Sequence, residues 1–340
     1  MKKILLLQLK RIGDLVLTTP AIAALRAKFP DACISLVVSA GSSELLPAIA
    51  GIDEPLVVGR GIRHDTVLWW HIARQRYDCC IDFTHNDRSA FLAALSRALR
   101  RVTADYVDVQ SELRALAYTE FADVSVFEMH NADYNLALLE PLGICDAPAQ
   151  LRLDLPRAAI ETAEQALATA EISGDFVLLH PGSARIEKFW EPERWCEVVD
   201  FAASRNLPCV VTGGTSPIEQ THLAAIKARS RQPFLDLSGK INLLTLTGLI
   251  SRARLVVTVD SAPVHIAAAL QTPQVVLYGP TNPHHWRPRF TSAIILHGAQ
   301  SAPLTVFSPF QAPAAMNRIS TEAVIDAMGA VLSRPRGAPL

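Results

Sequence analysis

Cysteine is scarce in this chain, and its few cysteines lack the spacing of a metal or redox motif. No two of them form a CxxC pair, and most lie in apolar segments typical of strands or helices. We therefore expect free, buried thiols in a reducing compartment. The six cysteines are Cys33, Cys79, Cys80, Cys145, Cys196 and Cys209.

Long apolar runs and a strong charge of either sign are also absent. No run approaches the roughly 20 residues that span a bilayer. The net charge is −1, which argues against nucleic-acid binding through bulk electrostatics. The N-terminus briefly resembles a signal peptide, but its apolar core Ile4–Leu9 is short, and Lys10 and Arg11 follow without a small-residue cleavage site. We expect a buried first strand and a cytoplasmic protein.

Several catalytic motifs are missing. There is no GxxxxGK[ST], HExxH or GxSxG sequence, no closely spaced His/Cys set, and no GxGxxG after the first predicted strand. The DxD carboxylate pair that usually holds a metal-bound nucleotide diphosphate is missing too. If a diphosphate binds, we expect a lysine and helix N-termini to neutralise it, without a metal site.

What is present is an alternation of short apolar runs with longer amphipathic segments. The chain has 340 residues, half of them apolar, which is typical of about two globular domains. Strands alternating with helices predict βαβ units and parallel sheets, hence an α/β fold. In the first half we expect strands at Ile4–Leu9, Cys33–Val38, Glu54–Val58, Cys79–Phe83 and Arg101–Ala104, and helices at Leu15–Lys28, Ser43–Ala50, Thr66–Arg76, Ser89–Leu99 and Asn131–Leu142.

A proline-flanked stretch, Asp146–Pro156, is the best linker, and the pattern restarts after it. We predict domains at 1–155 and 156–318, followed by a last helix within 319–340, with a ligand cleft between the two domains. The second half predicts strands at Phe176–Leu179, Cys209–Thr212, Phe234–Leu237, Leu255–Val259 and Gln274–Tyr278, and helices at Pro192–Arg205, Pro217–Ala228, Leu243–Ser251, Val264–Leu270 and Thr321–Leu332.

The segment Val259–His265 carries the most information about function. Asp260, Ser261 and His265 follow a predicted strand and open a helix, where ligands bind in parallel sheets and phosphates find free N–H groups. The alternative is structural, with Asp260 as a helix cap and His265 as a core histidine.

Two further loops follow predicted strands of the second half. The loop His180–Trp190 offers Ser183 and a lysine, Lys188, suited to a diphosphate. The loop Thr212–Glu219 offers a carboxylate, Glu219, that can accept hydrogen bonds from ribose hydroxyls. Each residue also has an ordinary interpretation, as a surface lysine or as a favourable charge at a helix N-terminus.

Two polar loops follow strands of the first half. Gln8–Asp14 contains Arg11 and places Asp14 either as a helix cap or as a base for an attacking hydroxyl. Asp82–Ser89 contains Arg88, which can bind an anionic acceptor or simply begin an exposed helix. A basic cluster at Arg97, Arg100 and Arg101 either touches anionic lipid or acceptor phosphates, or is a solvated helix end.

Taken together, these motifs resemble those of the family 9 glycosyltransferases, the ADP-heptose:lipopolysaccharide heptosyltransferases. The matching segments keep the family's order over about residues 1–330. They are Ile4–Leu9 with Gly13-Asp14 and Thr19-Pro20-Ala21, Tyr77–Asp82 with Arg88-Ser89, His180–Ser183 with Lys188 and Trp190, Gly213-Gly214 with Glu219, Ser238–Lys240, Asp260–His265 with the helix after it, and Tyr278–Thr281.

The resemblance implies a GT-B fold of two Rossmann-like domains and an inverting transfer of heptose from ADP-heptose to the inner core of lipopolysaccharide or another lipid A-linked acceptor. It implies Asp14 as the base, an acceptor bound by the N-terminal domain, where we expect contacts from Arg11 and Arg88, and no metal. It also implies that the last helix packs back on the N-terminal domain. The donor contacts it implies are Ser183, Lys188, Glu219, Asp260, Ser261, Ala262 and His265.

The chain departs from the family's pattern in two places. Ala262 stands where many members have glycine, and the region Ala302–Asn317 lacks cysteines that some members carry. These differences leave the exact donor and acceptor open. Peripheral contact with the inner face of the membrane, a sugar-nucleotide epimerase and a non-catalytic nucleotide-sugar-binding protein are the remaining hypotheses.

Overall fold

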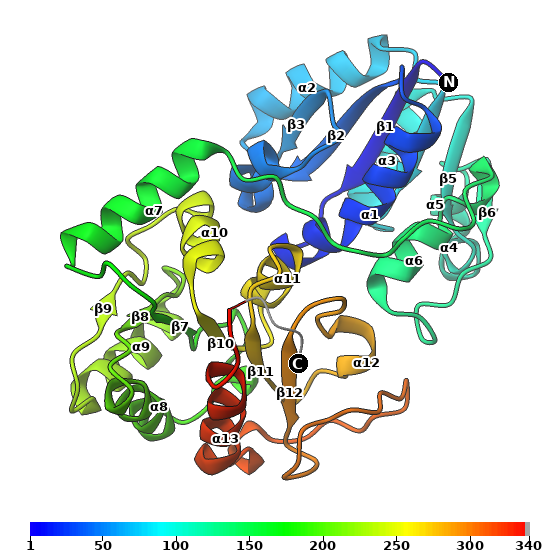
Figure 1. Ribbon diagram of the computed structural model, residues 1–340. Coiled ribbons are helices and arrows are strands. Elements are labelled where there is room, and N and C mark those ends of the chain that lie inside the picture. Colours follow the sequence, from blue (N-terminus) through cyan, green and yellow to red (C-terminus); the bar gives the residue numbers. More distant parts are fainter. Residues whose placement is uncertain (337–340) are drawn as a thin grey trace. The chain divides into compact units, whose positions relative to one another are not determined.

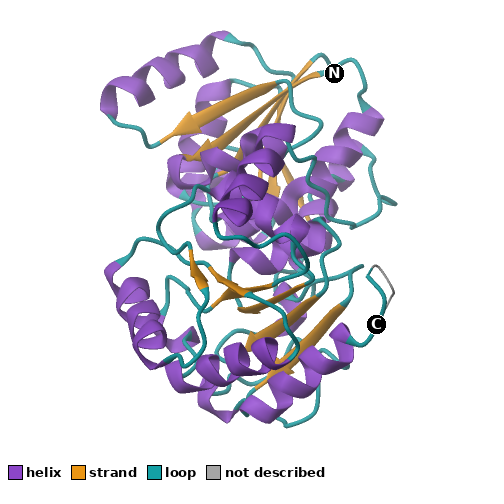
Figure 2. Ribbon diagram, turned by 60° about the vertical axis from the view of Figure 1, so that its left-hand side comes forward, coloured by secondary structure: helices purple, strands orange, loops and turns teal. Residues whose placement is uncertain are grey.

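The computed structural model describes residues 1–336 and divides the chain into two compact units. The first unit is Met1–Asp154, and the second begins at Leu155. The division falls inside the predicted linker, where residues 145–156 have no helix or strand. Figures 1 and 2 show one sheet in each unit, with helices on its faces. Among the described residues, no helix combines the length and the apolar character needed to cross a membrane.

The first unit is built on a six-stranded parallel sheet. Its strand order is β3-β2-β1-β4-β5-β6. The strands are β1 (Lys3–Gln8), β2 (Cys33–Ser39), β3 (Glu54–Val58), β4 (Cys79–Asp82), β5 (Arg100–Ala104) and β6 (Glu120–Ala122). The connections are α1 (Ile12–Lys28), the 3₁₀ helix η1 (Ala40–Ala48), α2 (Ile62–Arg74), α3 (Asp87–Ser96), α4 (Tyr106–Gln110) and α5 (Glu112–Ala115), and the unit continues with α6 (Asn131–Ala137) and η2 (Glu140–Leu142).

The first connecting helix tolerates a proline in its interior because a neighbouring side chain compensates. Pro20 lies within α1 and has no N–H to donate to the carbonyl of Val16, one turn earlier. The Thr19 hydroxyl donates to that carbonyl at 2.7 Å. The helix therefore runs on past the proline, and Asp14 remains fixed in its first turn.

The second unit repeats the plan with the strand order β12-β11-β10-β7-β8-β9, again all parallel. Its strands are β7 (Val177–His180), β8 (Cys209–Val211), β9 (Leu235–Asp236), β10 (Leu255–Val259), β11 (Gln274–Tyr278) and β12 (Ala293–His297). Its helices are α7 (Arg157–Thr169), η3 (Ile186–Lys188), α8 (Pro192–Ser204), α9 (Pro217–Arg229), α10 (Leu243–Arg252), α11 (Ala262–Ala269), α12 (Pro283–Trp286), η4 (Met316–Arg318) and α13 (Thr321–Leu332). The predicted α/β class with two Rossmann-like domains is confirmed.

The last helix belongs to the core of the second unit. Four side chains of α13, Val324, Ala327, Met328 and Val331, are buried in one cluster with α8 and the central strands. The structure thus assigns α13 to the second unit. The expectation that residues 319–340 pack back on the first domain stays a prediction. The apolar face of α13 is buried against the sheet of the second unit. Residues 337–340 of the predicted segment lie outside the described residues.

The cysteines are free thiols, as expected. Four are buried, but Cys33 and Cys145 are exposed, so burial was predicted wrongly for these two. Cys33 is the first residue of β2, and it is exposed while the five residues after it are buried.

The close approach of α7 and α10 generates a stability prediction. A Cβ atom added to Gly248 of α10 would lie 2.5 Å from the Ala159 carbonyl oxygen and 2.9 Å from the Ala163 Cβ atom. Alanine normally favours a helix over glycine by up to about 1 kcal/mol. We expect Gly248→Ala instead to lower the free energy of unfolding by about 1–3 kcal/mol, because the helices must separate. Denaturant unfolding measures this.

The matched control is Gly174→Ala in the same unit. An added Cβ atom there meets nothing within 4 Å. We expect this variant to unfold like the wild type. Equal stability of the Gly248→Ala variant and the wild type would contradict the proposed packing of α7 on α10.

Candidate active site

The carboxyl ends of the second unit's strands bring the predicted loops to one edge of the sheet. Thr258 of β10 lies opposite His180 of β7, and Leu179 of β7 lies opposite Val211 of β8. The loops that follow β7, β8 and β10 therefore leave the sheet side by side. The hydrogen bond between His180 Nδ1 and the Thr212 hydroxyl, 2.9 Å long, links two of these strand ends.

Two of the predicted donor residues form an ion pair. The Lys188 Nζ atom lies 2.5 Å from Asp260 Oδ2 and donates to the Asp260 carbonyl oxygen at 3.1 Å. The Lys188 side chain is 12% exposed and that of Asp260 is 8% exposed. Lys188 is therefore not the solvated surface lysine of the alternative interpretation. The cation lies on the peptide group that leads into α11.

The segment around Lys188 is anchored by aromatic side chains. The Phe189 ring stacks on the His222 ring of α9, with centroids 4.4 Å apart. The Trp190 indole is fully buried, donates to the Ile319 carbonyl at 2.9 Å and packs edge-on against Trp195. These contacts fix the backbone on the carboxyl side of Lys188, so its ammonium group reaches a defined place.

The N-terminus of α11 has free donors. Ser261 is the N-cap, but its hydroxyl donates to the Val259 carbonyl at 3.3 Å and does not cap the helix. Within residues 1–336, the peptide N–H groups of Ser261 and Ala262 have no acceptor. Unpaired N–H groups and the partial positive charge of a helix N-terminus suit an anion.

His265 lies in α11, close enough to Lys188 and Asp260 for both charges to act on it. Its side chain is buried, and its Nδ1 atom has no hydrogen-bond partner. Burial lowers the pKa of His265 to about 4; the Lys188 charge acts in the same direction, and the Asp260 charge opposes it. The imidazole is thus neutral at pH 7. It is buried as a core histidine would be, yet it retains an unsatisfied polar atom.

The Glu219 carboxylate joins the loops after β7 and β8. It accepts from the Gly214 N–H group at 3.2 Å and from the Ser216 hydroxyl at 2.9 Å. A Cβ atom on Gly182 would lie 2.3 Å from Glu219 Oε1, so the backbone before Ser183 runs directly against the carboxylate. Ser183 itself is nearly buried next to this contact. Glu219 therefore acts both as a helix N-terminal charge and as a brace for two candidate donor loops.

In the first unit, Asp14 lies in the first turn of α1 at the carboxyl end of β1. Its carboxylate accepts from the Arg11 N–H group at 3.2 Å, but the N-cap of α1 is Arg11 and Asp14 is the third helical residue. The interpretation of Asp14 as the helix N-cap was therefore wrong, although its carboxylate does hold the start of the helix. Burial raises the pKa of Asp14 above its ordinary value, although the Lys10 and Arg11 charges and the Arg11 N–H group oppose the shift. A carboxyl group with a raised pKa is a better proton acceptor when ionised.

The loop after β4 is held mainly by buried polar groups. The fully buried Asp82 carboxylate accepts from the Thr84 and His85 N–H groups and from the Tyr118 hydroxyl, at 2.7, 3.2 and 2.5 Å. The two ring nitrogens of His85 meet Thr103 and Tyr134, each at 2.9 Å. This network shapes the loop and leaves no free carboxylate at Asp82.

Arg11 and Arg88 are both exposed at this edge of the first sheet. Neither forms an ion pair within the described part of the chain. Arg88 lies in the first turn of α3, after the reciprocal hydrogen bonds between Asn86 and Ser89, and its guanidinium group is close to Gly59 at the end of β3. Both guanidinium groups are available to an anion.

The basic cluster suggested for lipid or phosphate binding is mostly structural. Arg100 forms an ion pair with Glu120, with Nε to Oε1 at 2.7 Å, and Arg101 donates to the carbonyl oxygens of Ala117 and Ala98. Only Arg97, which ends α3 in a left-handed conformation, remains solvated. Arg100 and Arg101 thus tie β5 to its neighbours, which supports the structural interpretation for these two residues.

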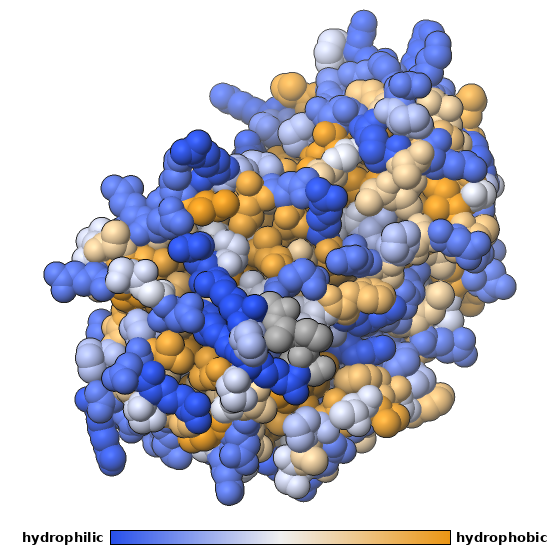
Figure 3. Space-filling view, in the orientation of Figure 1, coloured by the Kyte–Doolittle hydropathy of each residue, from blue (hydrophilic) through white to orange (hydrophobic). Residues whose placement is uncertain are grey.

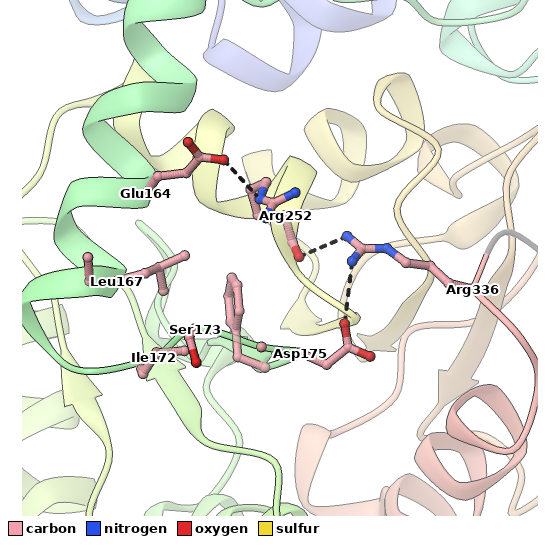
Figure 4. A pocket seen from close by; sticks show the side chains of 10 residues that line it. Glu164, Leu167, Ile172, Ser173, Asp175, Arg252 and Arg336 are labelled. Atoms are coloured by element: carbon pink, nitrogen blue, oxygen red, sulfur yellow. Dashed lines mark hydrogen bonds and ion pairs between the residues drawn. The ribbon is translucent and has the colours of Figure 1, made fainter.

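A pocket of about 370 Å³ lies elsewhere in the second unit, at the amino end of β7. Figure 4 shows Arg336 reaching Asp175 and the Arg252 backbone, while the Arg252 side chain pairs with Glu164. These arginines tie the end of the described chain to α7 and α10. The pocket is therefore at the opposite edge of the sheet from Lys188 and α11, and it contains none of the predicted site residues.

Within residues 1–336, no group of three or more His, Cys, Asp or Glu side chains is arranged to hold a metal ion. In the second unit, the candidate donor residues include a paired lysine, free helix N–H groups and a braced carboxylate. In the first unit, taken by itself, the candidates are a carboxyl group with a raised pKa and two arginines that form no ion pair among the described residues.

Comparison with known proteins identifies the family. Residues 66–307 match the model of "Glycosyltransferase family 9 (heptosyltransferase)". The chain is 29% identical over 290 residues to the lipopolysaccharide heptosyltransferase 3 of Escherichia coli K12, covering 81% of this chain and 82% of that protein.

Two solved structures share the fold. A family 9 glycosyltransferase from Veillonella parvula superimposes with a TM-score of 0.84 at 24% identity, covering 97% of each chain. The E. coli ADP-heptose lipopolysaccharide heptosyltransferase II superimposes with a TM-score of 0.78 at 20% identity, covering 98% of each chain. The predicted GT-B class is confirmed by this likeness. Since the family model spans most of the sequence, the chain belongs to glycosyltransferase family 9, the heptosyltransferases.

Proposed function

We propose that this protein transfers a heptose from ADP-heptose to the inner core of lipopolysaccharide, or to another lipid A-linked acceptor, with inversion at the anomeric carbon. Membership of the family and the likeness to lipopolysaccharide heptosyltransferases support this reaction. The observation that carries the proposal is the position of the Lys188 ammonium group on the Asp260 peptide, next to the free N–H groups of Ser261 and Ala262.

This arrangement suits the diphosphate of a nucleotide sugar. As the bond between the anomeric carbon and the β-phosphate oxygen breaks, negative charge grows on the departing ADP. A lysine and fixed N–H dipoles stabilise that charge where it develops. We assign the donor to Ser183, Lys188, Glu219, Asp260, Ser261, Ala262 and His265, with Glu219 facing the ribose hydroxyls. In this scheme ADP leaves without a metal ion, and turnover should persist in EDTA.

The first unit supplies the acceptor side of the proposed reaction. The Asp14 carboxylate removes the proton of an acceptor sugar hydroxyl, whose oxygen then bonds to the anomeric carbon. Arg11 and Arg88 bind anionic groups of the acceptor, which their lack of ion-pair partners permits. With such an acceptor, we expect the enzyme to act in the cytoplasm, at the inner face of the membrane.

A donor panel tests the reaction. Purified protein is given ADP-heptose, or ADP-, UDP- and GDP-hexoses, with a truncated core lipid as acceptor, and products are identified by mass spectrometry. We expect transfer from ADP-heptose alone. Conversion of a donor without acceptor would indicate an epimerase, and tight nucleotide binding without any transfer would indicate a binding protein; either result contradicts the proposal.

The Asp14→Asn substitution should distinguish the catalytic role of Asp14 as a base from its structural role at the start of α1. The asparagine oxygen still accepts from the Arg11 N–H group, but it cannot take a proton. We expect kcat to fall by about 10²–10⁴-fold. Wild-type kcat/KM should fall as the pH drops through the raised pKa of Asp14, and this dependence should vanish in the variant.

The Asp14→Asn substitution should lower kcat without lowering the stability of the fold. The folded-state pKa of Asp14 is raised, so the stability linked to its protonated form is present at low pH and is lost as the pH rises through that pKa. At pH 7 the neutral asparagine should not lower the melting temperature. Glu322→Gln, in the first turn of α13, is the control and should leave kcat unchanged. Wild-type turnover by a folded Asp14→Asn variant would rule out the base.

Lys188 and Asp260 can be tested as a pair. Lys188→Ala leaves the Asp260 carboxylate buried and unpaired, which should cost about 3 kcal/mol of stability and raise the donor KM or lower kcat. Adding Asp260→Asn should recover most of the lost stability. If the pair were purely structural, the double variant would also regain activity; we expect it to regain the melting temperature only.

Gly182→Ala tests the brace formed by Glu219. The new Cβ atom would displace the carboxylate, which is pinned by Gly214 and Ser216. We expect the donor KM to rise about tenfold, as it should for Glu219→Ala, because both variants remove the same interaction. Combining the two should add little. Additive effects in a double-mutant cycle would show that Gly182 acts independently of Glu219.

A further inference from the structure

Helix α2 of the first unit is apolar on two faces. Leu68 and Ile72 are buried against the sheet, while Ile62, Val67 and Trp70 are 82%, 67% and 63% exposed. A helix at the surface of a soluble domain normally places polar residues opposite its buried stripe. The exposed apolar side chains of α2 are therefore not explained by the fold of the unit itself.

Helix α3 packs against α2 and also exposes an apolar side chain. The Trp69 ring of α2 meets the Phe91 ring of α3 edge-on, with centroids 5.3 Å apart, and Phe91 is still 48% exposed. We call Ile62, Val67, Trp70 and Phe91 the α2–α3 surface. Single exposed apolar residues are ordinary, but a group on two packed helices marks an interaction site. Figure 3 shows orange residues between projecting blue ones where Figure 1 draws α2.

Cations flank this surface without counter-ions. The side chains of Arg60, Arg63 and Arg76 form no ion pair within residues 1–336. Arg63 lies one turn before Val67 on α2. Arg74 lies one turn after Trp70 and places its guanidinium carbon 4.6 Å from the Trp70 ring centroid.

The carboxylates of α2 and α3 already have hydrogen-bond or ion-pair partners within the first unit. Asp65 is buried and accepts from the Gly59 N–H group at 2.9 Å. Asp87 is paired with Arg114, whose Nε atom lies 2.5 Å away. The α2–α3 surface therefore has arginines beside its apolar side chains, and the carboxylates of both helices already have partners.

We propose that the α2–α3 surface docks on an anionic lipid bilayer. Tryptophan favours the membrane–water interface, and arginines beside apolar side chains gain from anionic headgroups. A second copy of the chain fits less well, because a self-complementary interface would bring the unpaired arginines of both copies together. Docking would bring the enzyme to the membrane that holds its lipid-linked acceptor. The purpose of docking rests on the proposed function, whereas the test of docking does not.

Vesicle sedimentation with the full chain tests the proposal. The vesicles are phosphatidylcholine with or without phosphatidylglycerol, and they contain neither acceptor nor donor. We expect the wild type to bind only the phosphatidylglycerol vesicles, and less at high salt. Val67→Ser combined with Trp70→Ser should weaken binding at least about tenfold, because two side chains lose their burial. Arg60→Gln with Arg63→Gln should weaken binding and reduce its salt dependence.

The control replaces two apolar residues of the second unit that are even more exposed. Val306 and Phe310 are 78% and 92% exposed, and Val306→Ser with Phe310→Ser should bind vesicles as the wild type does. Both double variants should keep the wild-type melting temperature and turn over a detergent-dispersed acceptor normally. That turnover distinguishes a failed docking proposal from a failed enzyme assignment.

Three results would overturn the docking proposal. They are equal binding to both kinds of vesicle, wild-type binding by Val67→Ser with Trp70→Ser, and a dimer in light scattering that this double variant dissociates. The last result would assign the surface to a second copy of the chain.

Discussion

Parallel strand register is the constraint on which the candidate site depends. In a parallel sheet every strand delivers the chain to the same edge, and that edge collects the polar loops whose backbone groups the sheet cannot satisfy. In the second unit, Thr258 opposite His180 brings the loop of Lys188 beside the start of α11. The Lys188–Asp260 contact then follows, although the two residues are 72 positions apart in sequence.

That contact serves stability and function in different ways. A lone ammonium group in so buried a place would cost several kcal/mol, and the Asp260 carboxylate offsets this cost when no ligand is bound. Asp260 leaves the neighbouring N–H groups of Ser261 and Ala262 unused. The site is therefore ready for an anion without collapsing in its absence. A donor diphosphate would share Lys188 with Asp260 and take the free N–H groups.

Much of this organisation could be predicted from the sequence. The strands Glu54–Val58, Leu255–Val259 and Gln274–Tyr278 and the helix Thr321–Leu332 have their predicted bounds, since each combines a clear apolar pattern with a proline, glycine or cap signal. Helix α7 was missed because its buried stripe is Ala159, Ala163 and Leu167, and small side chains give weak periodicity. Those same alanines let Gly248 of α10 approach closely.

The sequence suggests the candidate site residues one at a time, and it does not show which of them contact one another. Nothing in local spacing couples Lys188 to Asp260, Phe189 to His222, or Gly182 to Glu219, because each pair is made by tertiary packing. For the arginines, the sequence did not show which side chains already have partners within the fold. Arg100 and Arg101 look solvated in the sequence, yet both make hydrogen bonds that hold strand β5 to its neighbours. Arg60, Arg63 and Arg76 around α2, in contrast, form no ion pair within residues 1–336.

Hydrogen–deuterium exchange of the full chain with and without ADP tests the central claim most directly. If ADP binds at the carboxyl edge of the second sheet, its addition should slow exchange in peptides covering Ser183–Lys188 and Asp260–His265. Peptides covering Glu164–Phe176, at the pocket on the opposite edge, should exchange as before. Protection of Glu164–Phe176 without protection around Lys188 and Asp260 would contradict the account.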